Sequence, residues 1–291
     1  MHPAPSVIIF TTLSGLGFGL LAWLGLGVLT PTGWVAFTFF AIAYLLAVGG
    51  LLASAFHLGH PERALKAFTQ WRTSWLSREA WLSVAALIVM AIHGAGLVFF
   101  AQHWAPVGWL GAALCLGAVL TTSMIYTQMR TVPRWRTWLT PALFLALSLG
   151  GGGLLAGQIT LALILLPLAA ILQIVWWVRG DSALTRSGTN LASATGLGHI
   201  GAPRAFEPPH TGSNYLTREF IHVVGRRHAQ KLRVIAFALG YVLPILLLAL
   251  PLPHVAAALA VLSHIAGILA SRWLFFAEAE HVVGLYYGKR T

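Results

Sequence analysis

Eight long apolar stretches dominate the 291-residue sequence and leave little between them. Each is about as long as the ~20 residues that an α-helix needs to cross the bilayer core. The runs are continuous rather than alternating, which excludes an outer-membrane β-barrel. The sequence therefore predicts an all-α polytopic membrane protein with eight transmembrane helices. These lie at 6–29, 34–56, 80–101, 106–127, 139–157, 159–178, 234–251 and 254–276.

The composition supports this class of protein. The sequence is 58% hydrophobic and only 9% charged, whereas a soluble domain carries roughly 25% charged residues. We expect a single membrane domain over residues 1–291. We expect no nucleic-acid partner, because no soluble domain remains to bind one. The single cysteine, Cys115, excludes an intramolecular disulfide and a cysteine-ligated cluster.

The basic residues are distributed asymmetrically. The connections at 30–33, 102–105, 157–159 and 251–254 contain no Lys or Arg. The positive-inside rule therefore places the other connections and both termini in the cytoplasm. A basic face of this kind, in a protein of net charge +11, favours contact with anionic lipid headgroups or with an acidic protein. Its residues are Arg63, Lys66, Arg72, Arg78, Arg130, Arg134, Arg136, those from Arg179 to Arg233, Arg272, Lys289 and Arg290.

One connection is much longer than the rest. Residues 180–231, between the sixth and seventh predicted spans, are rich in Gly, Pro, Ser and Thr, which predicts a long cytoplasmic loop. This loop also separates two similar strings, WLSRE at 75–79 and YLTRE at 215–219. If these strings correspond, the protein consists of two four-helix units of parallel topology. Otherwise, both strings are simply helix starts.

The strongest local motif is HLGHPER at residues 57–63. His57 lies where the second predicted span leaves the bilayer, and Gly59 breaks the helix there. Arg63 follows, and Glu79 opens the next span, so the backbone can return Glu79 towards His57 at the interface. A histidine and a carboxylate can exchange protons with a quinone headgroup. The alternative is that these side chains only anchor the protein among lipid headgroups.

Two tryptophans lie between this motif and the next span. Trp71 and Trp75 are expected to anchor at the membrane interface, where indole rings are enriched.

Two histidines lie deep within predicted spans, His93 in the third and His264 in the eighth. Both fall at a similar depth, so they could ligate a b-type haem axially. Neutral histidines inside a bundle can also simply bond to neighbouring helices. Apart from such histidines, we expect no Asp, Glu, Lys or Arg at mid-membrane depth, where ion-coupled transporters typically carry acidic residues.

Several motifs together resemble the membrane anchor subunit of the dimethyl sulfoxide reductase type, including the related anchor of cytoplasmic membrane-bound sulfite dehydrogenase. The resemblance extends over most of the sequence and includes its eight apolar spans. The most specific block is the C-terminal one. The motifs are HLGHPER at 57–63, LSREAW at 76–81, NYLTREF at 214–220 and RWLFFAEAEHVVGLYYG at 272–288.

The resemblance implies a subunit of an oxidoreductase complex in the bacterial inner membrane. Such an anchor holds a molybdopterin catalytic subunit and an iron–sulfur subunit, and exchanges electrons with ubiquinone or menaquinone. It implies quinone-binding roles for His57, Gly59, Arg63 and Glu79, with His57 and Glu79 handling protons. It implies no metal and no haem in this protein.

The predicted topology places the soluble partners on the cytoplasmic face, which favours the sulfite dehydrogenase type, with electrons passing from sulfite to quinone. A quinol-oxidising anchor of the dimethyl sulfoxide reductase type is the nearest alternative. Two others are a structural anchor without its own redox site and a secondary transporter.

Overall fold

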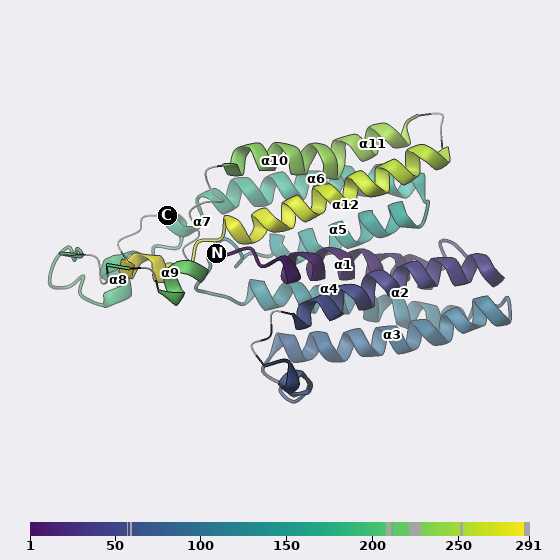
Figure 1. Cartoon of the computed structure of the whole chain (residues 1–291), viewed down its shortest axis with the longest axis horizontal. Helices are drawn as coiled ribbons and strands as arrows, with labels where there is room; N and C mark the ends of the chain where they lie inside the picture. Colours follow the sequence, from purple (N-terminus) through teal and green to yellow (C-terminus); the bar gives the residue numbers. More distant parts are fainter. Residues whose placement is uncertain are drawn as a thin grey trace.

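The computed structural model describes residues 1–56, 58, 60–207, 211–212, 214–220, 228–250 and 253–287. The regular secondary structure of this part consists of helices, with no strand (Figure 1). The longer helices are α1 (Pro5–Gly25), α2 (Gly33–Ala55), α3 (Trp75–Phe99), α4 (Ala105–Thr127), α5 (Leu139–Leu155), α6 (Ile159–Asp181) and α12 (Pro253–Ala277). The shorter elements are η1 (Pro61–Phe68), α7 (Ala183–Arg186), α8 (Leu191–Thr195), α9 (Tyr215–Glu219), α10 (Ala229–Phe237), η3 (Ala238–Val242), α11 (Leu243–Leu248) and η4 (Val282–Tyr287).

The prediction of an all-α polytopic membrane protein is confirmed. Among the described residues, seven helical segments are long and apolar enough to cross a membrane. One of them, Ala229–Leu248, comprises α10, η3 and α11 in succession. The predicted fifth span corresponds to the shorter apolar helix α5, which has 17 residues. At 1.5 Å per residue, α5 is roughly 25 Å long, at the lower limit for a membrane-spanning helix.

The helices form two side-by-side groups with α1 at their junction. Helix α1 packs against α2 and α4, which belong to the first group, and against α5 and α12, which belong to the second group. Helix α3 packs mainly on α4, whereas α6, α10 and α11 accompany α5 and α12 (Figure 1). One end of the bundle carries Met1, η1, the connection 128–138 and α7 to α9, and we call it the basic end. The connections 26–32, 100–104 and 156–158 lie at the opposite end and contain no Lys or Arg.

The segment between α6 and α10 is only partly a loop. Helix α6 continues to Asp181, and α7, α8 and α9 follow. The string at 215–219 forms the whole of the short helix α9, whereas the similar string at 75–79 begins the 25-residue helix α3. The segment is fastened to both terminal regions. The Glu219 carbonyl accepts from the amide of His2 (2.7 Å), and the Ala194 carbonyl accepts from the Tyr286 hydroxyl (2.6 Å).

The N-terminal amine also contacts the C-terminal region. Met1 donates to the Ala279 carbonyl at 2.8 Å. Burial, and to a smaller extent repulsion from this ammonium group, lowers the pKa of His281 below its ordinary value. The lowered pKa favours the neutral imidazole, and Nδ1 of His281 accepts from the Val283 amide at 3.1 Å.

Helices α1 and α5 approach each other unusually closely. A Cβ on Gly19 would overlap the carbonyl oxygen of Ser148, and one on Gly152 would overlap the backbone of Gly19. The close approach lets Ser148 Oγ donate to the Gly15 carbonyl at 2.6 Å. Small residues stabilise helix pairs in membranes because they allow this backbone contact. The junction between the two groups therefore depends on glycine at this crossing.

We predict that Gly19→Ala destabilises the protein by about 1–3 kcal/mol, because the added methyl group overpacks the crossing. Gly15→Ala is the matched control in the same helix, since a Cβ there meets nothing within 4 Å. Thermal unfolding of the detergent-purified protein measures both. Equal melting temperatures for the two variants would show that the α1–α5 crossing tolerates a side chain.

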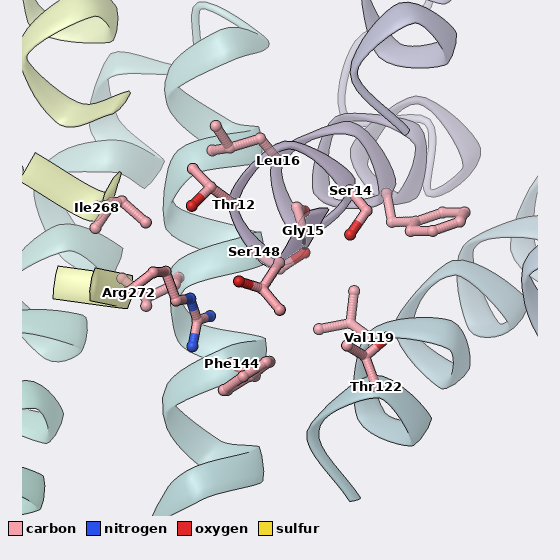
Figure 2. Close-up of a pocket in the computed structure, with 13 residues that line it drawn as sticks. Thr12, Ser14, Gly15, Leu16, Val119, Thr122, Phe144, Ser148, Ile268 and Arg272 are labelled. Carbon is pink, nitrogen blue, oxygen red and sulfur yellow. Dashed lines mark hydrogen bonds between the residues drawn. The ribbon is translucent and has the colours of Figure 1, made fainter. Parts of the chain in front are cut away.

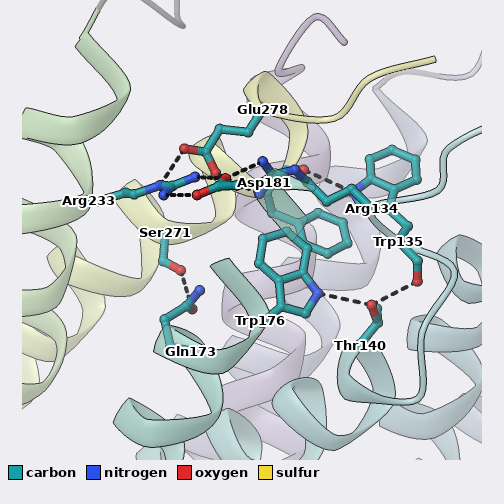
Figure 3. A network of polar contacts seen from close by, with 10 residues as sticks. Arg134, Trp135, Thr140, Gln173, Trp176, Asp181, Arg233, Ser271 and Glu278 are labelled. Atoms are coloured by element: carbon teal, nitrogen blue, oxygen red, sulfur yellow. Dashed lines mark hydrogen bonds and ion pairs between the residues drawn. The ribbon is translucent and has the colours of Figure 1, made fainter. Parts of the chain in front are cut away.

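A buried ion-pair network closes the second helix group at the basic end (Figure 3). Arg134, from the α4–α5 connection, contacts Asp181 at the end of α6 (2.7 Å) and Glu278 just after α12 (3.3 Å). Arg233 of α10 contacts the same two carboxylates at 2.5 and 2.7 Å. Two guanidinium groups thus share two carboxylates, which ties four segments together. Arg134 also lies 5.5 Å from the ring centroid of Trp176.

The two carboxylates of this network differ in exposure, which predicts different costs on removal. The Glu278 side chain is 4% exposed and the Asp181 side chain is 47% exposed. Glu278→Gln should cost about 3–5 kcal/mol, because it removes the buried one of the two carboxylates that balance Arg134 and Arg233. Asp181→Asn should cost less, since water reaches that site. Chemical or thermal unfolding of both variants tests the order, and an equal or larger loss for Asp181→Asn would contradict it.

Candidate functional site

The side chain of Glu79 is the central feature of the candidate site. It lies in the second turn of α3, near the basic end, and is 4% exposed. The hydroxyl of Thr122, from α4, donates to Glu79 Oε1 at 2.5 Å. The sequence places Glu79 at the mouth of a span, but the structure turns its carboxyl inward between two helices. A carboxyl in this setting has one fixed donor and a low-dielectric surrounding, which suits a group that holds or passes a proton.

The segment before α3 covers the start of that helix. The hydroxyl of Ser77 donates to the Ala67 carbonyl and accepts from the Gln70 amide. The indole of Trp81 donates to the Phe68 carbonyl at 3.0 Å. Thus η1 and the turn after it are fixed to the first turns of α3, beside the buried carboxyl.

Arg78 fixes the later part of the same segment. Its guanidinium donates to the carbonyls of Trp71 (3.0 Å) and Arg72 (2.7 Å). It also stacks over the Trp75 ring, 4.3 Å from the centroid. Arg78 therefore holds the segment before α3 against the first turn of that helix.

Two of the four predicted site residues, His57 and Gly59, lie outside the described residues. Arg63 lies on the surface of η1, with its side chain 60% exposed and its Nε 3.9 Å from Glu62. Within the described part of the structure, no hydrogen bond or ion pair joins Arg63 to Glu79. The structure therefore places Arg63 on η1 and Glu79 in α3 beneath it. Arg63 contacts Glu62, whereas Glu79 contacts Thr122.

An open aromatic groove lies on the outer side of α3 and α4. It has a volume of about 620 Å³, and its walls include Trp71, Trp75, Trp81 and Leu82. Thr121 of α4 also lines it, and the next residue in the sequence holds Glu79. The indole faces supply a flat apolar surface of the kind that ring-shaped ligands need. The groove and the buried carboxyl thus occupy neighbouring positions on the same helix pair.

A second, internal polar pocket is lined by Thr122 itself (Figure 2). Its polar walls include Thr12, Ser14 and Ser148, and its volume is sufficient for about one water molecule. Arg272 of α12 points into it. Thr122 lines this pocket and also binds the carboxyl of α3, so it connects that carboxyl with the interior of the bundle.

Arg272 corrects the sequence-based charge map, which places it with the cytoplasmic basic segments. It lies inside α12 and is 3% exposed. Its guanidinium lies over the Phe144 ring, 3.6 Å from the centroid, and its Nε has no hydrogen-bond partner among the described residues. An ionisable group between membrane helices is costly, and for that reason it is a candidate for function. In the sequence, Arg272 stands next to aromatic residues near the end of a predicted span, and this context resembles that of an interfacial arginine.

The two deep histidines have different surroundings. His93 of α3 faces His103, with ring centroids 5.0 Å apart, and lies near Phe40. His264 of α12 donates from Nδ1 to the Gly240 carbonyl at 2.7 Å. Each ring belongs to a different helix group, and the helix-bonding interpretation accounts for His264. Within the described ranges, no group of three or more His, Cys, Asp or Glu could hold a metal ion.

The fold and the sequence motifs define a membrane anchor subunit. The protein belongs to the family described as the DMSO reductase anchor subunit (DmsC), whose family model matches residues 1–288. The resemblance seen in the sequence is thereby confirmed.

Two known proteins are similar to this one. The first is the C-subunit of sulfite dehydrogenase from Allochromatium vinosum, with 32% identity covering 99% of each sequence. The second is the C-chain of anaerobic dimethyl sulfoxide reductase from Escherichia coli, with 32% identity over 47% of this sequence and 50% of that one. The protein is thus the anchor subunit of a complex of the dimethyl sulfoxide reductase family and a multi-pass membrane protein.

Sequence reasoning missed Thr122, Arg272 and the three-tryptophan groove. Thr122 resembles any small residue in an apolar helix, and only the packing of α3 on α4 brings it to the buried carboxyl. The sequence assigns Trp71 and Trp75 to interfacial anchoring, and the groove adds Trp81 to them. The spacing of tryptophans around Arg78 is the one signal in the sequence that could have indicated this groove.

Proposed function

We propose that this subunit exchanges electrons between an iron–sulfur subunit and membrane quinone, with Glu79 as its proton-transferring residue. The observation that carries the proposal is the buried carboxyl of Glu79, held by Thr122 next to an apolar aromatic groove. Reduction of a quinone consumes two electrons and two protons, and oxidation of a quinol releases them. The protein must therefore move protons wherever the electrons arrive.

The residues present fit a quinone. The groove formed by Trp71, Trp75 and Trp81 offers flat apolar walls for the ring and an open side for the tail. Glu79 lies on the same helix pair. Its carboxyl group can accept or donate a proton and is shielded from bulk water. Histidine side chains exchange protons near neutral pH. We propose that His57, which follows α2 in the sequence, completes the site together with Gly59 and Arg63.

Thr122 and Arg272 extend this role into the protein interior. Thr122 orients one carboxylate oxygen of Glu79, which leaves the other available for exchange. The pocket beyond Thr122 contains hydroxyl groups and the Arg272 guanidinium. We propose that this pocket gives the proton held at Glu79 a polar path into the bundle, with Arg272 among its walls.

We further propose that the basic end faces the cytoplasm of a bacterium, with the protein in the inner membrane. The absence of Lys and Arg from the connections at the opposite end supports this orientation. Iron–sulfur and molybdopterin subunits would dock on the basic end, where α7 to α9 and their connections present a long segment with exposed apolar side chains, among them Ile200 and Phe206. Docking there brings a cluster near the quinone site, as electron tunnelling over a short distance requires.

The direction we propose is from sulfite to quinone. Oxidation of sulfite to sulfate at a partner subunit uses one water and yields two electrons and two protons, which matches the demand of quinone reduction. The support is the similarity to the sulfite dehydrogenase protein over nearly the whole length of both sequences. The similarity to the dimethyl sulfoxide reductase protein extends over about half of each.

The decisive variant is Glu79→Gln, which keeps the shape and the acceptor for Thr122 but removes the exchangeable proton. We expect sulfite-dependent reduction of a soluble ubiquinone analogue to fall about 100-fold, within the range for loss of a general acid–base. Sulfite oxidation with an artificial acceptor that bypasses the anchor should be unchanged. Glu62→Gln, on the exposed surface of η1, is the control. Normal quinone turnover in the assembled Glu79→Gln complex would exclude Glu79 from the reaction.

His57→Ala provides an independent test of the interfacial half of the site. We expect an intact complex with strongly reduced quinone turnover, because a proton-exchanging and headgroup-binding group is removed. His60→Ala is the matched control, three residues away, where the imidazole bonds to exposed Glu62 (2.9 Å). Turnover normalised to bypass activity reports the effect. A loss of equal size in both variants would indicate disturbance of the segment instead of a role for His57.

A further inference from the structure

A second pocket, separate from the Glu79 site, lies at the basic end beside the second helix group. It has a volume of about 410 Å³ and lies between the α4–α5 connection and the end of α6 with α7. Five arginines converge on it from these two segments, which are far apart in the sequence. They are Arg130, Arg134, Arg136, Arg179 and Arg186.

Four of these five arginines have no carboxylate partner among the described residues. The exception is Arg134, which forms the inner wall and pairs with Asp181 and Glu278. Arg186 donates to a backbone carbonyl, that of Arg179. The side chains at 130 and 136 are exposed and make no polar contact in the described structure. Clustered positive charge without counter-charge repels itself, and so this pocket favours an anionic ligand.

Glycine at position 180 helps to form the floor. A Cβ there would lie 2.6 Å from Nη1 of Arg134. The absence of a side chain lets the guanidinium of Arg134 lie close against the end of α6. The network of Figure 3 thus holds the inner wall in place, while the outer arginines remain available to a ligand.

The pocket lies at the level where membrane helices end. Helix α4 ends at Thr127 and α6 at Asp181, and the pocket is lined by residues that follow α4 and by residues at and just after the end of α6. Towards the membrane, α6 presents exposed apolar side chains, including Ile171 and Val178. Trp138, which follows the pocket residue Thr137, is 66% exposed, as is typical of a side chain at the headgroup level.

We propose that this pocket binds the phosphate groups of an anionic phospholipid, with a two-phosphate headgroup of the cardiolipin class as the best match. Arginine forks bind phosphate oxygens in pairs, and four uncompensated guanidinium groups match two phosphates. The acyl chains would lie along the exposed apolar face of α6. Basic pockets between helices at the cytoplasmic surface bind such headgroups in general.

An acidic protein segment is the competing occupant, and the position of the pocket argues against it. The charged rim, which includes Arg179, continues directly into exposed apolar side chains of α6 such as Val178. A lipid satisfies both parts of this surface at once, because it joins an anionic group to apolar chains. The proposal does not depend on the quinone reaction.

Native mass spectrometry of the purified full-length protein tests the proposal. Tetraoleoyl cardiolipin is titrated against phosphatidylcholine with the same acyl chains. The variant Arg130→Gln/Arg136→Gln removes two arginines that support no other contact among the described residues. We expect about 30-fold weaker cardiolipin binding, from the typical contribution of two basic residues. The control is Arg204→Gln/Lys231→Gln, which removes the same charge from exposed positions outside the pocket.

The variant Arg130→Lys/Arg136→Lys separates the arginine fork from charge alone. We expect it to bind cardiolipin more weakly than the parent protein and more tightly than the glutamine variant. Several outcomes would overturn the proposal. They are equal cardiolipin affinity in the pocket and control variants, phosphatidylcholine binding as tight as cardiolipin, or displacement of cardiolipin by inorganic phosphate at equal concentration. Co-purification of the partner subunits with the same variants is measured in parallel. Its loss with unchanged cardiolipin binding would likewise overturn the proposal and assign the pocket to protein docking.

Discussion

The hydrocarbon core of a bilayer does not hydrate charge or peptide groups, and this constraint determines where the polar chemistry of the protein lies. Helices satisfy their own backbones, and the basic residues gather at one end of the bundle. Glu79 and Arg272 are the instructive exceptions. Both are buried among helices, one held by the Thr122 hydroxyl and the other above the Phe144 ring. The cost of burying them implies a benefit, and the proposed proton transfer to or from quinone provides one.

Two contacts of different character hold the helix groups in the geometry that the site requires. The α1–α5 crossing depends on direct backbone approach at Gly19 and Gly152, where no side chain fits. At the basic end, Arg134 and Arg233 share two carboxylates from other segments. The first contact is insensitive to charge and the second depends on it. Together they fix the position of α12, and with it that of Arg272, relative to α1 and α5.

The basic end combines three surfaces, to which we assign different partners. The aromatic groove beside Glu79 suits a ring, the arginine pocket at α6 suits phosphate, and we assign α7 to α9 to the soluble subunits. The groove is on the first helix group and the arginine pocket is on the second. This separation allows lipid and quinone to be held at the same time without competition for the same residues.

The sequence by itself determined the class of protein, the approximate spans and the segregation of charge, because hydrophobic length and Lys/Arg position can be read along the backbone. Its motifs also led to the family and to Glu79. Only the tertiary structure decided that Glu79 faces Thr122, that Arg272 is internal, and that arginines from two distant segments share one pocket. These features arise from packing between helices, and a single sequence carries no signal for which helix faces meet.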